Sequence, residues 1–155
     1  MMNRDLATGA VRPPALHGTS PVRRRLLRIG LGALILATGV GKALGIAGFA
    51  DVIRTYRFGL PDELLLPIGV AIAGLELVLG LWLLAGRRLA VAACVSLALN
   101  AGYGVVLASA LWRGLDLDNC GCFGVFLVSP LRWYSPLESL ALVGASALLW
   151  RLARR

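Results

Sequence analysis

Two cysteines separated by one glycine are the residues of this chain best suited to chemistry. Cys120 and Cys122 lie in the stretch DLDNCGCFG at 116–124. Cysteines at this spacing can bring their Cα atoms within the roughly 4.4–6.8 Å that a disulfide requires. Gly121 and Gly124 supply the unusual backbone angles of such a tight closure. Because a strained, exposed disulfide is of the labile or catalytic kind, the pattern predicts a redox-active pair.

Two other uses of the pair remain open from the sequence. The same spacing suits an inert disulfide, or a pair of buried thiols, that only orders the loop. Two thiolates without a neighbouring histidine leave a zinc site half made, so we expect no metal. The third cysteine, Cys94, is expected about 35–40 Å away and acts as a small hydrophobic residue. Because the chain has only one closely spaced thiol pair, it cannot pass electrons between two pairs of its own, and a redox reaction would need a partner protein or molecule.

An acid and a base stand inside apolar stretches of the chain. Glu76 lies near the middle of one such stretch, where an acid costs about 2.5–3.5 kcal/mol on insertion scales. It is expected to point into the protein and to be either protonated or paired with Lys42 or Asn100. Lys42 could instead extend its amine to the membrane surface. Glu76, Lys42 and Asn100 either hold the helices together by polar contacts or form a functional site.

The composition requires a solvent other than water. Of the 155 residues 58% are hydrophobic, and the mean hydropathy is +0.78, whereas soluble domains are about 45–50% apolar. Lys and Arg total 16 against 8 acids. The basic residues form short runs between apolar spans at 23–25, 87–88 and 151–155, as topology-setting charges do. Nucleic-acid binding is excluded on this ground, and the partner is the lipid bilayer.

The hydrophobic pattern predicts an all-α membrane protein, an antiparallel bundle of four transmembrane helices. Each span needs about 20 apolar residues. Residues 1–22 are predicted to be a disordered cytoplasmic tail, and residues 23–155 the transmembrane domain. The predicted spans cover about 26–46, 63–85, 89–112 and 136–152.

The arginine count predicts the orientation. The tail, the 86–88 turn and the C-terminus hold most of the arginines, so both termini are expected in the cytoplasm. The loops at 47–62 and 113–135 then face outward, where disulfides persist. Aromatic and basic residues between Phe49 and Phe58 make the first loop amphipathic. That loop is expected to lie at the membrane interface or to cover the cysteine loop.

Small residues at four-residue spacing predict where the helices approach one another, because close packing drives helix association in lipid. Three spans carry such a stripe, which predicts a compact bundle. The stripes are Ala33, Ala37, Gly41 and Gly45 in the first span, Gly69, Ala73, Glu76 and Gly80 in the second, and Ala92, Ser96, Asn100, Gly104 and Ala108 in the third.

Four motifs in order resemble the methylamine-utilisation protein E (MauE) family, within the wider DoxX-like group of four-helix membrane proteins. They are GVGK at 39–42, then Phe49, Ile53 and Tyr56, then GLELVLG at 74–80, and CGCFG at 120–124. The resemblance covers about Leu26 to Leu152. Its most specific element is the CGCFG string in its place between the third and fourth helices.

The resemblance implies a redox-associated protein of the bacterial cytoplasmic membrane. Family members are thought to help mature a disulfide-rich periplasmic subunit of methylamine dehydrogenase. They often accompany a thioredoxin-like partner, methylamine-utilisation protein D (MauD). The residues carried over are Cys120 and Cys122 as the redox pair, supported by the rest of CGCFG (Gly121, Phe123, Gly124) and by Lys42 and Glu76.

The combined hypothesis is thiol–disulfide exchange with an extracytoplasmic client, which would make the protein a component of a thiol–disulfide oxidoreductase. No cofactor is evident in the sequence, and a membrane quinone is a candidate electron acceptor. Two alternatives stay open. One is a non-catalytic membrane assembly scaffold, and the other is a small-solute or proton pathway centred on Glu76.

Overall fold

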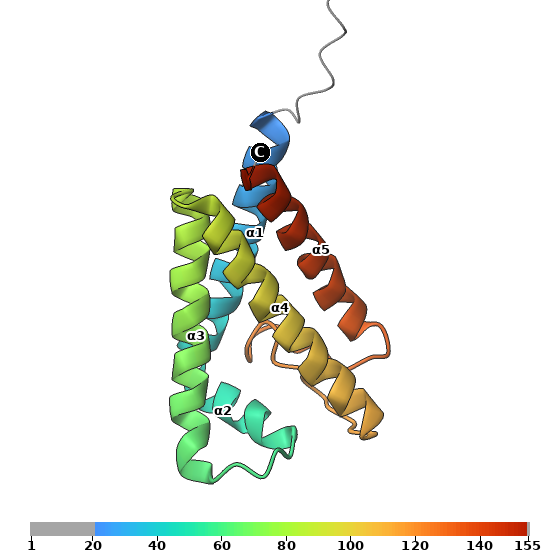
Figure 1. Ribbon diagram of the computed structural model, residues 1–155. Helices are drawn as coiled ribbons and strands as arrows, with labels where there is room; N and C mark the ends of the chain where they lie inside the picture. Colours follow the sequence, from blue (N-terminus) through green and yellow to red (C-terminus); the bar gives the residue numbers. More distant parts are fainter. Residues whose placement is uncertain (1–20, 155) are drawn as a thin grey trace, which may run out of the picture.

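The structure, a computed structural model, describes residues 21–154 and is all-helical there (Figure 1). Four of its helices are long and apolar enough to cross a membrane: α1 (Pro21–Leu44), α3 (Asp62–Ala85), α4 (Leu89–Trp112) and α5 (Ser135–Arg154). A shorter helix, α2 (Ile46–Thr55), follows α1. The structure thus confirms the predicted all-α fold with four candidate spans.

The long helices alternate in direction, so the bundle has two distinct ends (Figure 1). The end that holds Pro21, the 86–88 turn and Arg154 is called the terminal end. The opposite end, called the loop end, holds α2 and the segment 113–134. The side of the membrane that each end faces stays a prediction.

Two of the predicted boundaries were wrong near α2. The first span was expected to reach Ile46, but α1 ends at Leu44 and Gly45 separates it from α2. The stretch 47–62, expected to be a loop, is largely this second helix. It is helical because its apolar residues lie on one face, which buries Phe49 and Ala50 against the rest of the protein.

The ends of the described chain also differ slightly from expectation. Residues 1–20 of the predicted tail lie outside the described residues, whereas Pro21 and Val22 already form the first turn of α1. Proline suits this position because the first helical N–H has no partner in any case. At the other end α5 extends to Arg154, two residues beyond the predicted limit.

The long helices form two hairpins. Helix α1 packs chiefly on α3, and α4 packs chiefly on α5, whereas contacts between the hairpins are fewer. Helices α3 and α4 separate toward the loop end (Figure 1). The buried apolar residues form two clusters. The cluster nearer the terminal end consists of Leu31, Ile35, Leu79, Leu83, Ala92, Ala93 and Leu149, and the cluster at the loop end consists of Tyr56, Leu107, Ala110, Leu117, Cys120 and Leu131.

Glycines allow α1 and α3 to approach closely, but the predicted stripe on α1 was wrong. Ala33 and Ala37 are exposed. The contact uses Gly39, where an added Cβ would lie 2.9 Å from the backbone of α3, and Gly80, where it would lie 2.7 Å from α1. A helical stripe can be read from spacing, but the stripe that meets a neighbour depends on how the helices rotate.

Candidate functional site

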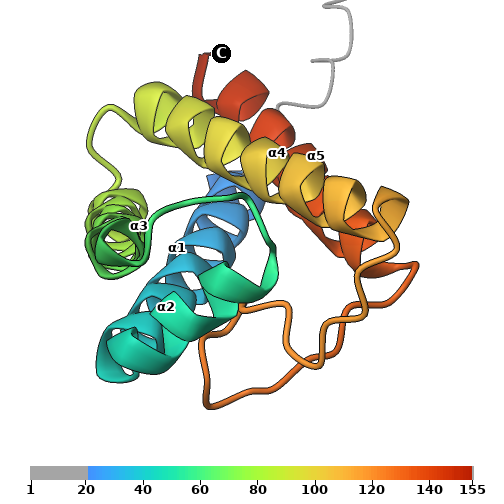
Figure 2. The ribbon, with the colours of Figure 1, turned by 90° about the horizontal axis from the view of Figure 1, so that it is seen from below.

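The segment 113–134 folds back between the two hairpins at the loop end (Figure 2). Two backbone hydrogen bonds join its arms: the N–H of Cys120 donates to the carbonyl of Ser129 at 2.7 Å, and the N–H of Leu131 donates to that of Leu117 at 2.9 Å. The segment is therefore an ordered part of the bundle, and it carries the cysteines inward.

A tight turn sets the positions of the two cysteines. Gly121 and Gly124 have φ values of +72° and +73°, which confirms the unusual backbone angles predicted for them. The side chain of Asn119 accepts a hydrogen bond from the N–H of Gly121 at 2.9 Å and donates one to the carbonyl of Gly124 at 3.1 Å. Asn119 was not among the predicted site residues, although asparagine before a glycine turn is a known signal.

The turn sits directly against α1. A Cβ added to Gly41 would lie 2.7 Å from the carbonyl oxygen of Phe123, and one added to Gly124 would lie 2.7 Å from the backbone of Gly41. Farther along, Gly45 contacts the side chain of Val125. Gly41 and Gly45, expected to pack against another helix, instead make room for the cysteine loop.

The two sulfur atoms lie 3.0 Å apart, and both cysteines are free thiols. Cys120 is buried, with 9% of its surface exposed, and Cys122 is half-buried. The pair was expected in an exposed loop on the outer side. The expected exposure was wrong, because α2 and the turn after it cover the pair, whereas the outward orientation stays a prediction.

The hydrogen bond between the two thiols shifts the pKa of each in opposite directions. The pKa of Cys120 is lowered to about 6, mainly because the neighbouring Cys122 thiol stabilises its thiolate by a hydrogen bond, while burial opposes this. The pKa of Cys122 is raised, first because it shares that hydrogen bond and then because it is buried. The arrangement therefore favours one thiolate and one thiol near neutral pH.

A buried ion pair lies directly beside the cysteines. The Nζ of Lys42 is 2.8 Å from both carboxylate oxygens of Glu76, and each side chain is only 1% exposed. The same Nζ donates a hydrogen bond to the carbonyl oxygen of Cys122 at 2.9 Å. The predicted pairing with Lys42 is confirmed, and the alternative that Lys42 extends to the surface was wrong. Asn100 instead donates to Ser96.

An aromatic residue that the sequence analysis missed completes this network. The hydroxyl of Tyr103 donates a hydrogen bond to Glu76. Its ring centroid lies 5.3 Å from the Nζ of Lys42, and that of Phe49 lies 5.4 Å away, so two rings shield the amine. Tyr103 stands one helical turn after Asn100, and that position on a face with polar residues could have revealed it.

Helix α2 and the turn after it cover the cysteine loop, as one of the two alternatives predicted. Tyr56, at the C-terminus of α2, donates a hydrogen bond from its hydroxyl to the carbonyl of Cys120 at 2.8 Å. The ring of Phe58 stacks on Tyr56 with centroids 5.8 Å apart. The side chain of Val52 packs so closely on Gly121 that no larger residue fits at position 121, because an added Cβ would lie 2.8 Å from Val52.

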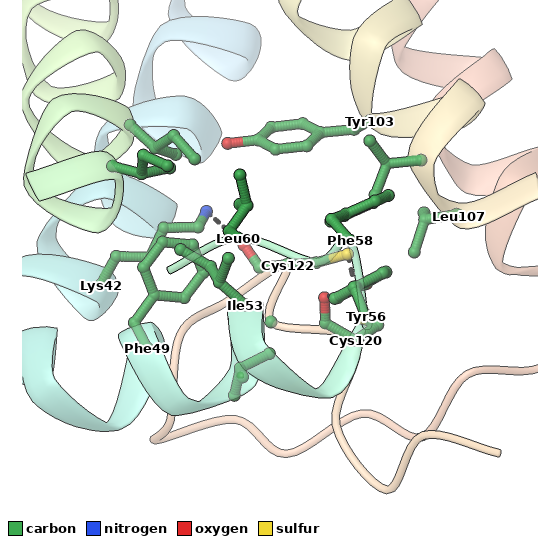
Figure 3. Close-up of a pocket in the computed structure, with 15 residues that line it drawn as sticks. Lys42, Phe49, Ile53, Tyr56, Phe58, Leu60, Tyr103, Leu107, Cys120 and Cys122 are labelled. Atoms are coloured by element: carbon green, nitrogen blue, oxygen red, sulfur yellow. Dashed lines mark hydrogen bonds between the residues drawn. The ribbon is translucent and has the colours of Figure 1, made fainter. Parts of the chain in front are cut away.

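Beneath this cover lies a small cavity of about 170 Å³ (Figure 3). Both cysteines, Lys42 and Tyr103 line it, and the remaining wall is almost entirely apolar. The labelled side chains come from α1, α2, α4, the cysteine loop and the connection after α2 (Figure 3). The site can therefore shelter a reactive sulfur from water.

The comparison with protein families agrees with this architecture. The family model described as "Methylamine utilisation protein MauE" matches residues 22–152, which cover nearly all of the four long helices and the whole cysteine loop. The chain belongs to the MauE family. With its four apolar helices, it is a multi-pass membrane protein of this family.

One curated relative extends the MauE comparison. The methylamine utilization protein MauE of Paracoccus denitrificans is 29% identical over 116 residues, which are 75% of this chain and 62% of the relative. The match thus covers less than two thirds of the relative's length. No solved structure matches the chain.

Proposed function

We propose that this protein performs thiol–disulfide exchange at the Cys120–Cys122 pair and thereby supports the maturation of an extracytoplasmic client. The observation that carries the proposal is the separation of 3.0 Å between the two sulfur atoms in a turn packed against α1 and α2. A disulfide requires about 2.05 Å, so a shift of about 1 Å would join the sulfurs.

The lowered pKa of Cys120 supports the oxidising direction of exchange. A stable thiolate favours the reduced pair, which makes the corresponding disulfide a stronger oxidant. It also makes Cys120 the better leaving group. Attack is therefore expected at the sulfur of Cys122, the more exposed of the two.

The exchange balances as follows. A client thiolate attacks the Sγ of Cys122, the bond between the two cysteines breaks, and Cys120 leaves as a thiolate. A second client thiolate then attacks the client sulfur of the mixed disulfide and releases Cys122. The client gains a disulfide and loses two electrons, which reduce the pair. Of the two protons that the client thiols release, one ends on Cys122 and one in solvent.

The immediate partner in this proposal is a thioredoxin-like extracytoplasmic protein of the MauD type. A small domain with its own thiol pair could reach a site that α2 partly covers, and then pass the disulfide to a larger client. The Paracoccus relative is named for methylamine utilization, so a subunit of methylamine dehydrogenase is the client we propose.

The exchange requires the loop end to face the outer side of the bacterial cytoplasmic membrane. Arginines gather at the terminal end, among them Arg23, Arg88 and Arg151, and this supports the orientation because such residues favour the cytoplasmic side. The measurement is a thiol-modification gel shift in intact cells, with an impermeant reagent and with or without reductant. Labelling from outside only after reduction is expected, and no labelling under either condition would contradict the orientation.

Trapping a mixed disulfide tests the exchange itself. In Cys120→Ser, the Cys122 thiolate can attack an oxidised partner, whose second sulfur leaves as a thiolate. Because Cys120 is no longer present to release the partner, this mixed disulfide is expected to persist, whereas Cys122→Ser should hold much less. Cys94→Ser is the matched control, because Cys94 is a free cysteine far from the pair in sequence. Complexes are resolved on non-reducing gels. Recovery of no disulfide-linked partner from either single variant would contradict exchange.

The same variants separate the proposal from its alternatives. If the double Cys120→Ser, Cys122→Ser variant still supports client maturation, the protein is a scaffold. If Glu76→Gln abolishes transport in proteoliposomes while both cysteines are dispensable, the protein is a pathway for protons or small solutes. The exchange proposal expects the double variant to fail in maturation and the cysteines to be required.

A further inference from the structure

A second and larger cavity reaches the cysteine pair from between α1, α4 and α5. Its volume is about 390 Å³, against about 170 Å³ for the cavity under α2. Ligand pockets for small molecules are usually about 300–1,000 Å³, so only the larger of the two falls in that range. Of the pair, Cys122 alone lines it, whereas both cysteines line the smaller one.

The polar groups of this cavity include two without partners. Ser139 is 7% exposed, and its hydroxyl makes no hydrogen bond within residues 21–154. Asn100 is 4% exposed; its amide nitrogen donates to Ser96, and its side-chain oxygen accepts no hydrogen bond in that range. Both residues line the cavity, so a hydroxyl and a side-chain oxygen are available there to hydrogen-bond a ligand.

These two groups come from neighbouring helices. Ser139 on α5 packs beside Gly104 on α4, with its Cβ 3.5 Å from the position of an added glycine Cβ. Asn100 stands one turn before Gly104 on the same helix. The apolar part of the wall is formed by Leu34, Leu99 and Leu142. The cavity thus combines a polar end near a thiol with an apolar remainder.

We propose that this cavity binds the ring of a lipid-soluble quinone, which reoxidises the Cys120–Cys122 pair. This inference rests on the proposed exchange function, which leaves the pair reduced after each client. As their S–S bond forms, the two cysteines lose two electrons and the one proton on Cys122. The quinone takes up the electrons, that proton and a second proton from solvent, and leaves as a quinol.

The residues divide this task by their chemistry. The hydroxyl of Ser139 donates a hydrogen bond to a ring carbonyl, and the side-chain oxygen of Asn100 accepts one from the quinol hydroxyl. The leucines contact the isoprenoid tail. Helices α1 and α5, which both line the cavity, are long and apolar enough to cross a membrane. The client then uses the α2 side of the pair, and the quinone uses the side between α1 and α5.

The test uses the purified full-length protein in detergent micelles, first reduced and then freed of reductant under anaerobic conditions. Decylubiquinone is added, quinone absorbance is followed, and free thiols are counted with a maleimide. The wild-type protein is expected to consume one quinone as the pair loses both thiols. Ser139→Leu fills the polar end and is expected to slow the reaction at least about tenfold.

Controls separate this effect from general damage. Val143→Leu adds bulk on the same helix but in a different groove, between α4 and α5, and is expected to react as the wild type does. Oxidation by glutathione disulfide should be equal in all three proteins. If Ser139→Leu fails to fold, Ser139→Ala still removes the donor and should raise the KM for quinone about three- to tenfold.

Direct binding supplies a second readout. An azido-quinone should label the first half of α5 after illumination, and labelling should fall in Ser139→Leu but not in Val143→Leu. A wild-type pair that glutathione disulfide oxidises but quinone does not would overturn this inference and leave the exchange function standing. Failure of both oxidants would overturn both. Wild-type rates and labelling in both Ser139 variants would also overturn the quinone site.

Discussion

The terminal end and the loop end of this bundle differ in what fills the space between helices. At the terminal end the buried side chains are mostly apolar and pack closely, as Leu83 and Leu149 do at 0% exposure. At the loop end an ion pair, two thiols and two cavities lie beside a second apolar cluster that includes Leu107 and Ala110. The comparison teaches that close apolar packing holds the hairpins together, while the loop end uses polar contacts to position a reactive segment.

Breaking the ion pair should have the largest effect. Lys42→Met leaves the Glu76 carboxylate buried without its partner, which is expected to destabilise the protein by about 3–5 kcal/mol. It also frees the carbonyl of Cys122 and should raise the alkylation rate of the cysteines. The measurements are chemical denaturation in detergent micelles and the rate of maleimide labelling.

Two further variants sharpen this result. The double variant Lys42→Met, Glu76→Leu removes both charges and should recover much of the lost stability. Leu83→Ala at the terminal end should destabilise by about 2–5 kcal/mol yet leave the alkylation rate unchanged. If Leu83→Ala raised the alkylation rate of the cysteines as much as Lys42→Met does, the two ends would not be distinct.

The glycine turn should give the next largest effect. Gly124→Ala places a side chain at φ +73° and 2.7 Å from the backbone of Gly41, so the loop must shift. Gly114→Ala is matched, because Gly114 has φ +66° but nothing within 4 Å. The left-handed conformation alone costs about 1–2 kcal/mol. The loss of unfolding free energy, measured by chemical denaturation, should be larger in Gly124→Ala than in Gly114→Ala. Equal losses would contradict the tight contact with α1.

The alkylation rate of the pair should increase by about tenfold as the pH rises through the pKa of Cys120. The thiolate is the reactive form, so in a Cys94→Ser background the rate should rise as the pH increases through about 6. Above about pH 7 it should level off, whereas a thiol with an ordinary pKa near 8.5 would continue to gain reactivity. A rate that still rises steeply above pH 8 would contradict the lowered pKa.

Removing the hydroxyl of Tyr56 should have the smallest effect. Tyr56→Phe loses the hydrogen bond to the carbonyl of Cys120, a contact that contributes about 0.5–1.5 kcal/mol. The cover should open more often, and labelling of the pair by an impermeant reagent should increase severalfold. Tyr134→Phe is the control, because Tyr134 is 45% exposed. No difference between the two variants would mean that Tyr56 does not hold the cover.

The four long helices could be predicted from sequence because a membrane demands long apolar runs with internally satisfied backbones. The Cys120–Cys122 pair was also recognisable, since its two-residue spacing is local. Helix α2 was taken for a loop because ten amphipathic residues between glycine and proline signals suit either form. Its burial depends on α3 and the cysteine loop, which lie elsewhere in the chain.

The sequence by itself determined that the chain crosses a membrane in four helices and carries one closely spaced thiol pair. Only the tertiary structure decided that Lys42 meets Glu76 across α1 and α3, that Tyr103 joins them from α4, and that the thiols lie under a cover. The physical reason is that spacing along a helix defines its possible faces, whereas the rotation and separation of the helices select the face that is used. Buried charges then adopt whatever partners that packing brings within reach.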